Sequence, residues 1–245
     1  MILAIIQARM GSTRLPGKVL MKVNGRPLLA YQLDRISKSK KLDKVIVATS
    51  TLERDNAIEN FCKDYGVDCY RGSENDVMSR YYECCKQYNP DTVVRMTADC
   101  PLIDPEIIDK VVQKFKDDNV DYCANTVPPE KSKFPDGSDI EVFSMKALEM
   151  ANTEVQDEHR REHVTFQFWQ DLNYTSSQYI QNKDWSNYRI TVDYPEDFEV
   201  VRCILNVLNK KRTFGNLGEI ISIIDSNQEI KAKNAKYYFG QGWKK

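Results

Sequence analysis

The chain has 245 residues, and its 35 lysines and arginines nearly balance its 36 aspartates and glutamates, giving a formal net charge of −1. This balance favours neither a nucleic-acid nor a membrane partner, and seven cysteines without a C-x-x-C spacing disfavour a zinc cluster and a disulfide framework. The first apolar run ends at Ile6, too short for a signal peptide or a membrane span, so we expect a soluble, cytoplasmic protein.

Short apolar runs alternate with amphipathic stretches through the first half of the chain. The runs predict strands over residues 1–8, 44–49, 67–70, 92–97 and 121–125. The amphipathic stretches predict helices over residues 27–37, 54–65, 75–87 and 105–116, the third capped by Ser73 or Asn75 and the fourth by Asp104. This alternation predicts an α/β fold with a doubly wound, mostly parallel sheet, in which ligands bind at the carboxyl ends of strands.

The regular alternation of predicted strands and helices ends after residue 125. A turn-rich segment leads to predicted strands over residues 138–143, 174–179 and 189–192 and helices over residues 145–152, 157–169, 194–208 and 217–225, the last of the chain. We predict a core made of residues 1–125 and 188–245, into which residues 126–187 are inserted as a small lobe. The sequence leaves open whether Tyr237, Tyr238, Phe239 and Trp243 in the tail pack on the core.

The first predicted strand runs into a loop rich in glycine and basic residues, which is typical of a polyphosphate-binding loop. Arg9 is expected to point toward a phosphate, Gly11 and Ser12 to let the backbone approach it, and Lys18 to supply a point charge. The spacing is neither a Walker loop nor G-x-G-x-x-G. The alternative is a plain surface loop that happens to carry basic residues.

Two further predicted strands end in an aspartate that precedes a proline. Asp99 follows the strand at residues 92–97, and Asp193 follows the strand at residues 189–192. Mg²⁺ favours one or two carboxylates together with substrate phosphates, so the two side chains could share a metal. Taken alone, Asp193 reads as a helix N-cap, with Glu196 completing a capping box.

A weaker pattern follows in the inserted segment. Asp139 and Glu141 lie two residues apart, which places them on one face of a strand. His159 and His163 are four residues apart on a predicted helix, but no H-E-x-x-H glutamate lies between them, so zinc binding is disfavoured. This mixed acidic and basic face either binds a polar acceptor or is only a solvated face that carries salt bridges.

These segments carry a family resemblance. Residues 8–18 resemble the signature loop of the cytidylyltransferases that make CMP-activated ulosonic acids, the 3-deoxy-manno-octulosonate and acylneuraminate enzymes, and most of all their SpsF-type spore-coat relatives. Similar motifs follow in the family's order at residues 71–80, 97–102, 136–143, 161–165 and 192–197. The resemblance covers residues 2–200 and departs from the octulosonate enzymes around residues 98–101, which leaves the acceptor pocket open.

The resemblance implies a Rossmann-like nucleotidyltransferase fold and transfer of CMP from CTP to an acidic sugar, with release of pyrophosphate, for polysaccharide synthesis. It implies Mg²⁺ on Asp99 and Asp193, a homodimer formed through the inserted lobe, and catalytic roles for Arg9, Lys18 and Asp99. The implied nucleotide-binding residues are Ala8, Arg9, Met10, Gly11, Ser12, Lys18, Arg71, Ser73 and Asp99. The implied acceptor-binding residues are Asp139, Glu141, Arg161 and His163.

Three other functions stay open at this point. The first is a nucleotidyltransferase that uses another nucleoside triphosphate or a phosphorylated acceptor other than a sugar acid. The second is a glycosyltransferase, which the absence of an Asp-x-Asp pair disfavours. The third is a nucleotide-binding protein without catalytic activity, which the joint presence of Lys18, Asp99 and Asp193 disfavours.

Overall fold

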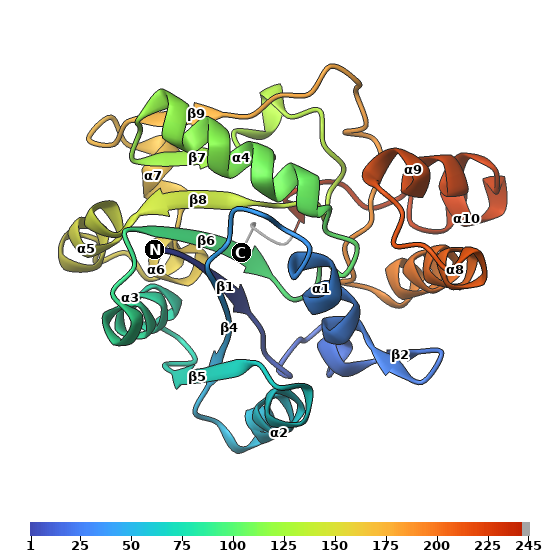
Figure 1. Ribbon diagram of the computed structural model, residues 1–245, viewed down its shortest axis with the longest axis horizontal. Helices are drawn as coiled ribbons and strands as arrows, with labels where there is room; N and C mark the ends of the chain where they lie inside the picture. The colour runs from blue at the N-terminus through green and yellow to red at the C-terminus, as the bar shows by residue number, and fades with distance from the viewer. Residues whose placement is uncertain (242–245) are drawn as a thin grey trace.

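The computed structural model describes residues 1–241, which form one layered α/β unit around a central sheet (Figure 1). The sheet has seven strands in the order β5-β4-β1-β6-β8-β7-β9. Their bounds are Ile2–Gln7 (β1), Lys44–Ser50 (β4), Asp68–Gly72 (β5), Thr92–Thr97 (β6), Tyr122–Ala124 (β7), Glu141–Ser144 (β8) and Ser176–Gln178 (β9). Only β8 runs antiparallel to its neighbours, β6 and β7. The predicted mostly parallel, doubly wound sheet is therefore confirmed.

Helices cover both faces of this sheet. They are Leu28–Ile36 (α1), Asn56–Tyr65 (α2), Val77–Tyr88 (α3), Pro105–Asp118 (α4), Met145–Glu154 (α5), Glu158–His163 (α6), Phe166–Gln170 (α7), Pro195–Lys211 (α8), Leu217–Asp225 (α9) and Gln228–Lys233 (α10). Three 3-10 turns, Lys18–Leu20 (η1), Glu53–Asp55 (η2) and Pro129–Lys131 (η3), and a small hairpin of Lys22–Val23 (β2) and Arg26–Pro27 (β3) complete the elements. Within the described residues, every helix is too short or too polar to cross a membrane.

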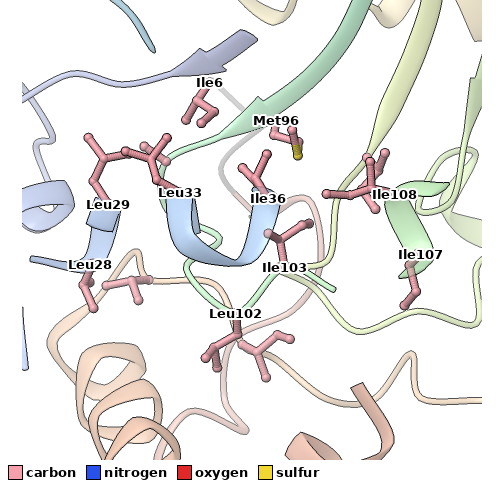
Figure 2. Packing of buried hydrophobic residues seen from close by; sticks show 14 of the residues in the cluster. Ile6, Leu28, Leu29, Leu33, Ile36, Met96, Leu102, Ile103, Ile107 and Ile108 are labelled. Atoms are coloured by element: carbon pink, nitrogen blue, oxygen red, sulfur yellow. The ribbon is translucent and has the colours of Figure 1, made fainter. Parts of the chain in front are cut away.

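Strand β1 explains why the core has two halves. Ala4 and Ile6 face a cluster formed with α1, α4, α8 and α9, whereas Leu3 and Ile5 face a second cluster formed with α3, α5 and α7. Side chains alternate along a strand, so a strand that is apolar on both faces must be covered on both sides. Figure 2 shows part of the first cluster, in which Leu33 and Ile36 of α1 gather with Ile6 of β1 and Met96 of β6.

Several predicted elements are wrong in detail. Residues 189–192 form no strand, because only Arg189 pairs, in a single bridge with Asp136. The helix predicted over residues 157–169 is two helices, α6 and α7, separated by Val164, whose φ of +62° ends α6. Helix α9 is followed by α10, so it is not the last helix. The spacing of apolar residues in the sequence does not show that a β-branched residue such as Val164 adopts a positive φ.

The caps also differ from the predictions at two of three helices. Asp104 caps α4 as predicted, since its carboxylate accepts from the Glu106 N–H at 2.9 Å. Helix α3 is capped by Asp76, which is neither of the two predicted residues and directly follows Asn75. Its carboxylate accepts from the Ser79 N–H. At α8 the carboxylate of Asp197, and not Glu196, accepts from the backbone N–H groups that precede the helix.

The inserted segment takes part in the central sheet. Strand β8 lies between β6 and β7, and β9 extends the edge beside β7. Because β8 begins at Glu141, Asp139 precedes the strand, and the prediction that both share one strand face is wrong. The division into a core of residues 1–125 and 188–245 and a lobe of residues 126–187 stays a prediction, as does dimerisation through that lobe.

Candidate active site

The basic loop after β1 is held in a fixed shape by its own hydrogen bonds. Ala8 N–H donates to the Ala48 carbonyl at 3.0 Å, and Met10 N–H donates to Asp55 Oδ1 at 2.7 Å. The Met10 carbonyl accepts from Gly17 N–H at 3.0 Å, which closes the loop at its base. Gly17 has a φ of +71°, a conformation that glycine adopts without strain. The loop is therefore closed by hydrogen bonds of its own backbone.

The side chain of Arg54 lies over Gly11. A Cβ at this position would come within 2.7 Å of the Arg54 guanidinium. Arg54 also donates to Glu74 at 2.6 Å, so it bridges the loop and the segment before α3. Ser12 Oγ accepts from Leu15 N–H at 3.2 Å. Sequence reasoning missed Arg54, because its proximity to Gly11 depends on the packing of η2 against the loop.

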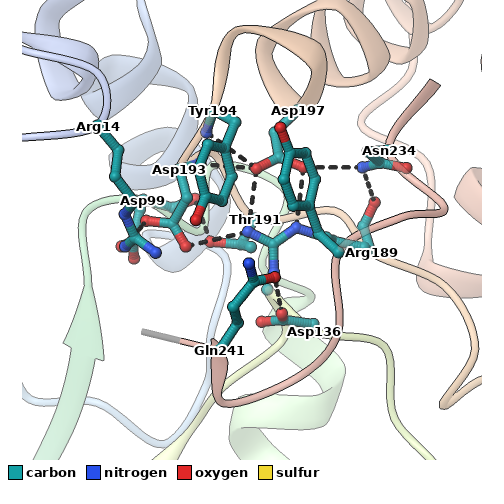
Figure 3. Close-up of polar contacts among 12 residues, drawn as sticks. Arg14, Asp99, Asp136, Arg189, Thr191, Asp193, Tyr194, Asp197, Asn234 and Gln241 are labelled. Atoms are coloured by element: carbon teal, nitrogen blue, oxygen red, sulfur yellow. Dashed lines mark hydrogen bonds and ion pairs between the residues drawn. The ribbon is translucent and has the colours of Figure 1, made fainter. Parts of the chain in front are cut away.

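Lys18 links the two aspartates predicted as metal ligands. Its Nζ donates to Asp99 Oδ2 at 2.9 Å and to Asp193 Oδ1 at 2.8 Å. Asp99 follows β6, and Asp193 lies just before α8, so residues far apart in the sequence meet at the carboxyl end of the parallel strands. Figure 3 shows Asp99 and Asp193 facing each other, with Arg14 beside them. The three predicted residues form one cluster.

The charges in this cluster stabilise one another. Burial raises the pKa of the Asp99 carboxyl, but the Lys18 ammonium and the Thr97 hydroxyl outweigh burial and hold that pKa below its usual range. Burial lowers the pKa of Lys18, and the two carboxylates outweigh it, so the net shift is upward. Lys18 and Asp99 are therefore charged at neutral pH, and the side chains of Asp99 and Asp193 converge on one cationic position, the Lys18 ammonium.

Arg189 anchors the second aspartate, and sequence reasoning assigned it no role. Its side chain is only 8% exposed and forms ion pairs with Asp136, with Asp193 at 3.0 Å and with Asp197 at 2.9 Å (Figure 3). Burial lowers the pKa of Arg189, but the hydrogen bond to Asp197 and the charges of Asp136 and Asp193 raise it above its usual value. In the sequence, only the position of Arg189 four residues before Asp193 could have pointed to this anchoring role.

A cavity of about 240 Å³ opens beside these carboxylates. Its lining brings together six predicted site residues: Arg9, Asp99, Asp139, Glu141, His163 and Asp193. It also includes residues that the sequence analysis did not single out as site residues, among them Arg14, Arg95, Thr126, Trp169, Phe239 and Gln241. A larger cavity of about 470 Å³ near the starts of α4 and α9 contains none of the predicted residues. We therefore take the cavity beside Asp99 and Asp193, here called the cleft, as the candidate active site.

The remaining predicted residues lie outside the cleft lining. The Arg161 guanidinium donates to Asp76 at 2.8 Å and to the Val155 carbonyl at 2.8 Å, and it lines a neighbouring cavity of about 450 Å³ that shares Arg9 with the cleft. Arg71 donates to the carbonyls of Ser50 and Leu52, both at 3.0 Å. Both guanidinium groups hold loops of this chain together. Ser73 Oγ accepts from Asp76 N–H at 3.0 Å.

The two acidic residues of the inserted segment differ in their surroundings. Glu141 forms an ion pair with Arg95 and accepts from the Tyr122 hydroxyl at 2.6 Å. Asp139 accepts from Thr126 Oγ1 at 2.8 Å and from Gly137 N–H at 3.0 Å, and no ion pair is found for it within the described chain. Burial raises the pKa of Asp139 to about 6. Asp139 is thus a buried carboxylate whose charge is costly above that pH.

This cost predicts a pH-dependent gain in stability for Asp139→Asn. Between the ordinary pKa of 3.8 and about 6, the folded protein holds a proton that the unfolded chain has lost, so the unfolding free energy falls as pH rises. We expect the variant to be more stable than wild type by about 1–2 kcal/mol at pH 7.5, and this difference to vanish toward pH 4. Urea denaturation across this range measures it.

The matched control for this variant is Asp64→Asn, which changes an exposed aspartate on α2. Its unfolding free energy should follow that of wild type at every pH. A variant at Asp139 that is less stable than wild type at pH 7.5 would show that the Thr126 and Gly137 hydrogen bonds outweigh the cost of the buried charge.

The donor set fits a magnesium ion better than a zinc ion. Asp99 and Asp193 offer carboxylate oxygens that already converge on one cationic group, the Lys18 ammonium. Within residues 1–241, no group of three or more histidine, cysteine, aspartate or glutamate side chains is arranged to hold a metal. Mg²⁺ is commonly held by one or two carboxylates and completes its shell with water and substrate phosphates, which two aspartates satisfy.

This chain is similar to members of one enzyme family. A model of the cytidylyltransferase family matches residues 3–217. The spore coat polysaccharide biosynthesis protein SpsF of Bacillus subtilis is 30% identical over 236 residues, which are 93% of this chain and 95% of that protein. The 3-deoxy-manno-octulosonate cytidylyltransferase of Bdellovibrio bacteriovorus is 37% identical over 120 residues, 48% of this chain and 47% of that one.

A solved structure agrees over the same length. The cytidylyltransferase from Leptospira borgpetersenii superposes with a TM-score of 0.86 at 34% identity, covering 94% of this chain and 96% of that chain. Because the family match, the SpsF relative and the superposed structure extend over most of the chain, the resemblance drawn from the sequence is confirmed. The chain belongs to the cytidylyltransferase family and is a CTP-dependent nucleotidyltransferase.

Proposed function

We propose that this enzyme transfers CMP from CTP to an acidic sugar of the ulosonic acid class, giving a CMP-sugar and pyrophosphate for glycan or polysaccharide synthesis. The observation that carries the proposal is the convergence of Asp99 and Asp193 on Lys18, directly beside the basic loop. The relatives support the acceptor class, since one is a 3-deoxy-manno-octulosonate cytidylyltransferase and another acts in spore coat polysaccharide biosynthesis.

In the proposed reaction, the acceptor hydroxyl attacks the α-phosphorus of CTP, and the bond to the departing pyrophosphate breaks as the new oxygen–phosphorus bond forms. Such a displacement asks the protein mainly for positioning and for neutralisation of charge. Arg9 and Lys18 neutralise charge on the triphosphate and on the leaving pyrophosphate. The closed backbone of residues 10–17 presents a fixed surface to the phosphates.

Asp99 and Asp193 are the residues that would hold Mg²⁺ in this proposal. When bound, the ion would supply charge neutralisation at the phosphates and lower the pKa of the acceptor hydroxyl. Arg189 fixes the orientation of Asp193 through a hydrogen bond of 3.0 Å, and the Thr97 hydroxyl does the same for Asp99 through a hydrogen bond of 2.5 Å. The acceptor would occupy the part of the cleft lined by Asp139, which leaves Arg9 to the nucleotide.

Pyrophosphate release with a panel of acceptors tests the proposal. We expect release with CTP, MgCl2 and a sugar acid such as 3-deoxy-manno-octulosonate or N-acetylneuraminate, and none with neutral hexoses. Release only with a phosphorylated acceptor would replace the sugar acid with the alternative acceptor class. Transfer of a sugar from a nucleotide sugar would instead identify a glycosyltransferase.

Thermal denaturation with nucleotides is the control for this panel. A ligand at 100 times its dissociation constant stabilises the folded state by about 2.7 kcal/mol, which corresponds to roughly 5–10 °C for a chain of this size. We expect CTP with MgCl2 to give such a shift and UTP, GTP and ATP to give smaller ones. Binding of CTP without pyrophosphate release from any acceptor would indicate a nucleotide-binding protein that lacks catalytic activity.

A further inference from the structure

The end of the described chain returns to the cleft. Phe239, Gly240 and Gln241 line the same cavity as Asp99 and Asp193. Figure 3 shows Gln241 on the side of the cleft where Asp136 and Arg189 lie. Trp243, the remaining aromatic residue of this tail, lies outside the described residues. The family match ends at residue 217, so these tail residues are not part of the matched segment.

Specific contacts hold this tail in place. Asn234 is buried, and its Nδ2 donates to the Arg189 carbonyl at 3.1 Å and to Asp197 Oδ1 at 2.9 Å. The Tyr237 ring stacks on the Tyr194 ring, with centroids 3.9 Å apart and planes within 4°. The Tyr237 hydroxyl donates to Glu196 at 3.1 Å. Parallel stacking at this distance fixes both the position and the orientation of the tail.

One anchoring residue, Tyr194, lies next to the candidate active site. Tyr194 directly follows Asp193, and the guanidinium of Arg14 from the basic loop lies 5.1 Å from the centre of the Tyr194 ring. Arg14 also donates to Asp193 at 2.6 Å. The Tyr194 ring is thus in contact with both the tail and the basic loop, so the position of the tail depends on the same residues that position Asp193.

The tail faces the acceptor part of the cleft. Phe239 packs against the second apolar cluster, which includes Val127 and Phe168 of the inserted segment and none of the residues of the basic loop. Phe239 and Gln241 carry no charge, unlike Arg9 and Arg14 of the basic loop, which line the same cleft. An aromatic ring can cover the C–H face of a sugar, and an amide can both donate to a carboxylate and accept from a hydroxyl.

Resting on the proposed function, we propose that residues 237–241 form one wall of the acceptor subsite. Phe239 and Gln241 contact the sugar acid, and Tyr237 is a positioning residue that holds the wall against Tyr194. These residues determine how tightly the acceptor binds, and they leave CTP binding unchanged.

Steady-state kinetics of Gln241→Ala and Phe239→Ala test the wall directly. With the sugar acid that gives pyrophosphate release, 3-deoxy-manno-octulosonate being the first probe, we expect each variant to raise the acceptor KM about 10-fold, the effect of losing one hydrogen bond or apolar contact. The KM for CTP and the thermal shift caused by CTP should stay at wild-type values. Gln228→Ala, an exposed glutamine at the start of α10, is the matched control and should change neither constant.

The positioning role of Tyr237 has its own test. Tyr237→Ala removes the ring stack and should raise the acceptor KM as much as the two wall variants do. Tyr237→Phe keeps the ring and loses only the hydroxyl contact to Glu196, so it should restore most of the lost acceptor affinity. A merely structural role would lower the melting temperature of Tyr237→Ala without separating the two KM values.

Failure of this inference and failure of the proposed function give different results. If wild type releases pyrophosphate with a sugar acid and all three alanine variants keep its acceptor KM, the wall is absent and the function stands. If the variants change the KM for CTP instead, the tail belongs to the nucleotide site. If wild type releases pyrophosphate with none of the sugar acids while CTP still raises its melting temperature, the acceptor class is wrong, and so is the inference that rests on it.

Discussion

Asp99→Asn is expected to lower turnover at least about 100-fold at saturating CTP, acceptor and MgCl2. The substitution keeps the size of the side chain and one oxygen but removes the charge that faces Lys18 at 2.9 Å. Loss of one electrostatic contact to a transition state typically costs a factor of 100–1000 in turnover, and under the proposed function a metal-binding charge is lost as well. Pyrophosphate release measured against MgCl2 concentration checks this.

The control for this experiment separates chemistry from folding. Asp117→Asn changes an exposed aspartate on α4 and should leave turnover unchanged. Asp99→Asn should still unfold in a single thermal transition, because Asp193 continues to pair with Lys18 at 2.8 Å. Turnover within a few-fold of wild type at saturating MgCl2 would exclude Asp99 as a metal ligand.

Two of the site residues that the sequence predicted lie shortly after a strand of the central sheet. Arg9 follows β1, and Asp99 follows β6, the strand that pairs with β1 in parallel. Parallel strands bring their carboxyl ends to one edge of the sheet, so the convergence of these residues needs no knowledge of the loops. The same reasoning found Asp193, although the segment before it makes only one bridge with Asp136.

The parts that the sequence missed depend on contacts between distant segments. Arg189 acts through Asp136, 53 residues away, and Asn234 reaches Arg189 from 45 residues away. Residues of this kind show no periodicity and no motif, because their role is fixed by tertiary packing. Strand β8 is a similar case, since its pattern predicts a strand but not its insertion between β6 and β7.

Lys18→Gln is expected to lower turnover by a factor similar to that expected for Asp99→Asn. In addition, it should destabilise the metal-free protein by about 2–3 kcal/mol at pH 7. Removing one partner of a fully buried ion pair costs about 3–5 kcal/mol, and the partial exposure of Asp99, at 26%, reduces this figure. Asp193 keeps its pairs with Arg14 and Arg189, so the unpaired charge falls mainly on Asp99. Urea denaturation in the presence of a chelator measures the difference.

The pH dependence of this difference identifies its cause. In wild type, Lys18 holds the pKa of Asp99 below the ordinary value of 3.8, so this contribution to stability is present above that value and is lost as pH falls through the lower pKa. In the variant the part of this lowering that Lys18 supplies is lost, although the Thr97 hydroxyl still donates to Asp99, so the difference in unfolding free energy between the two proteins should narrow below about pH 4.

Magnesium gives a second readout that does not depend on activity. Without the Lys18 ammonium, the two carboxylates face each other with one fewer cation, so MgCl2 alone should raise the melting temperature of Lys18→Gln more than that of wild type. Lys22→Gln, an exposed lysine on β2, should respond as wild type does. An equal response of Lys18→Gln and wild type to MgCl2 would mean that Asp99 and Asp193 do not attract a divalent cation, and the site would then have to act through Lys18 and the arginines alone.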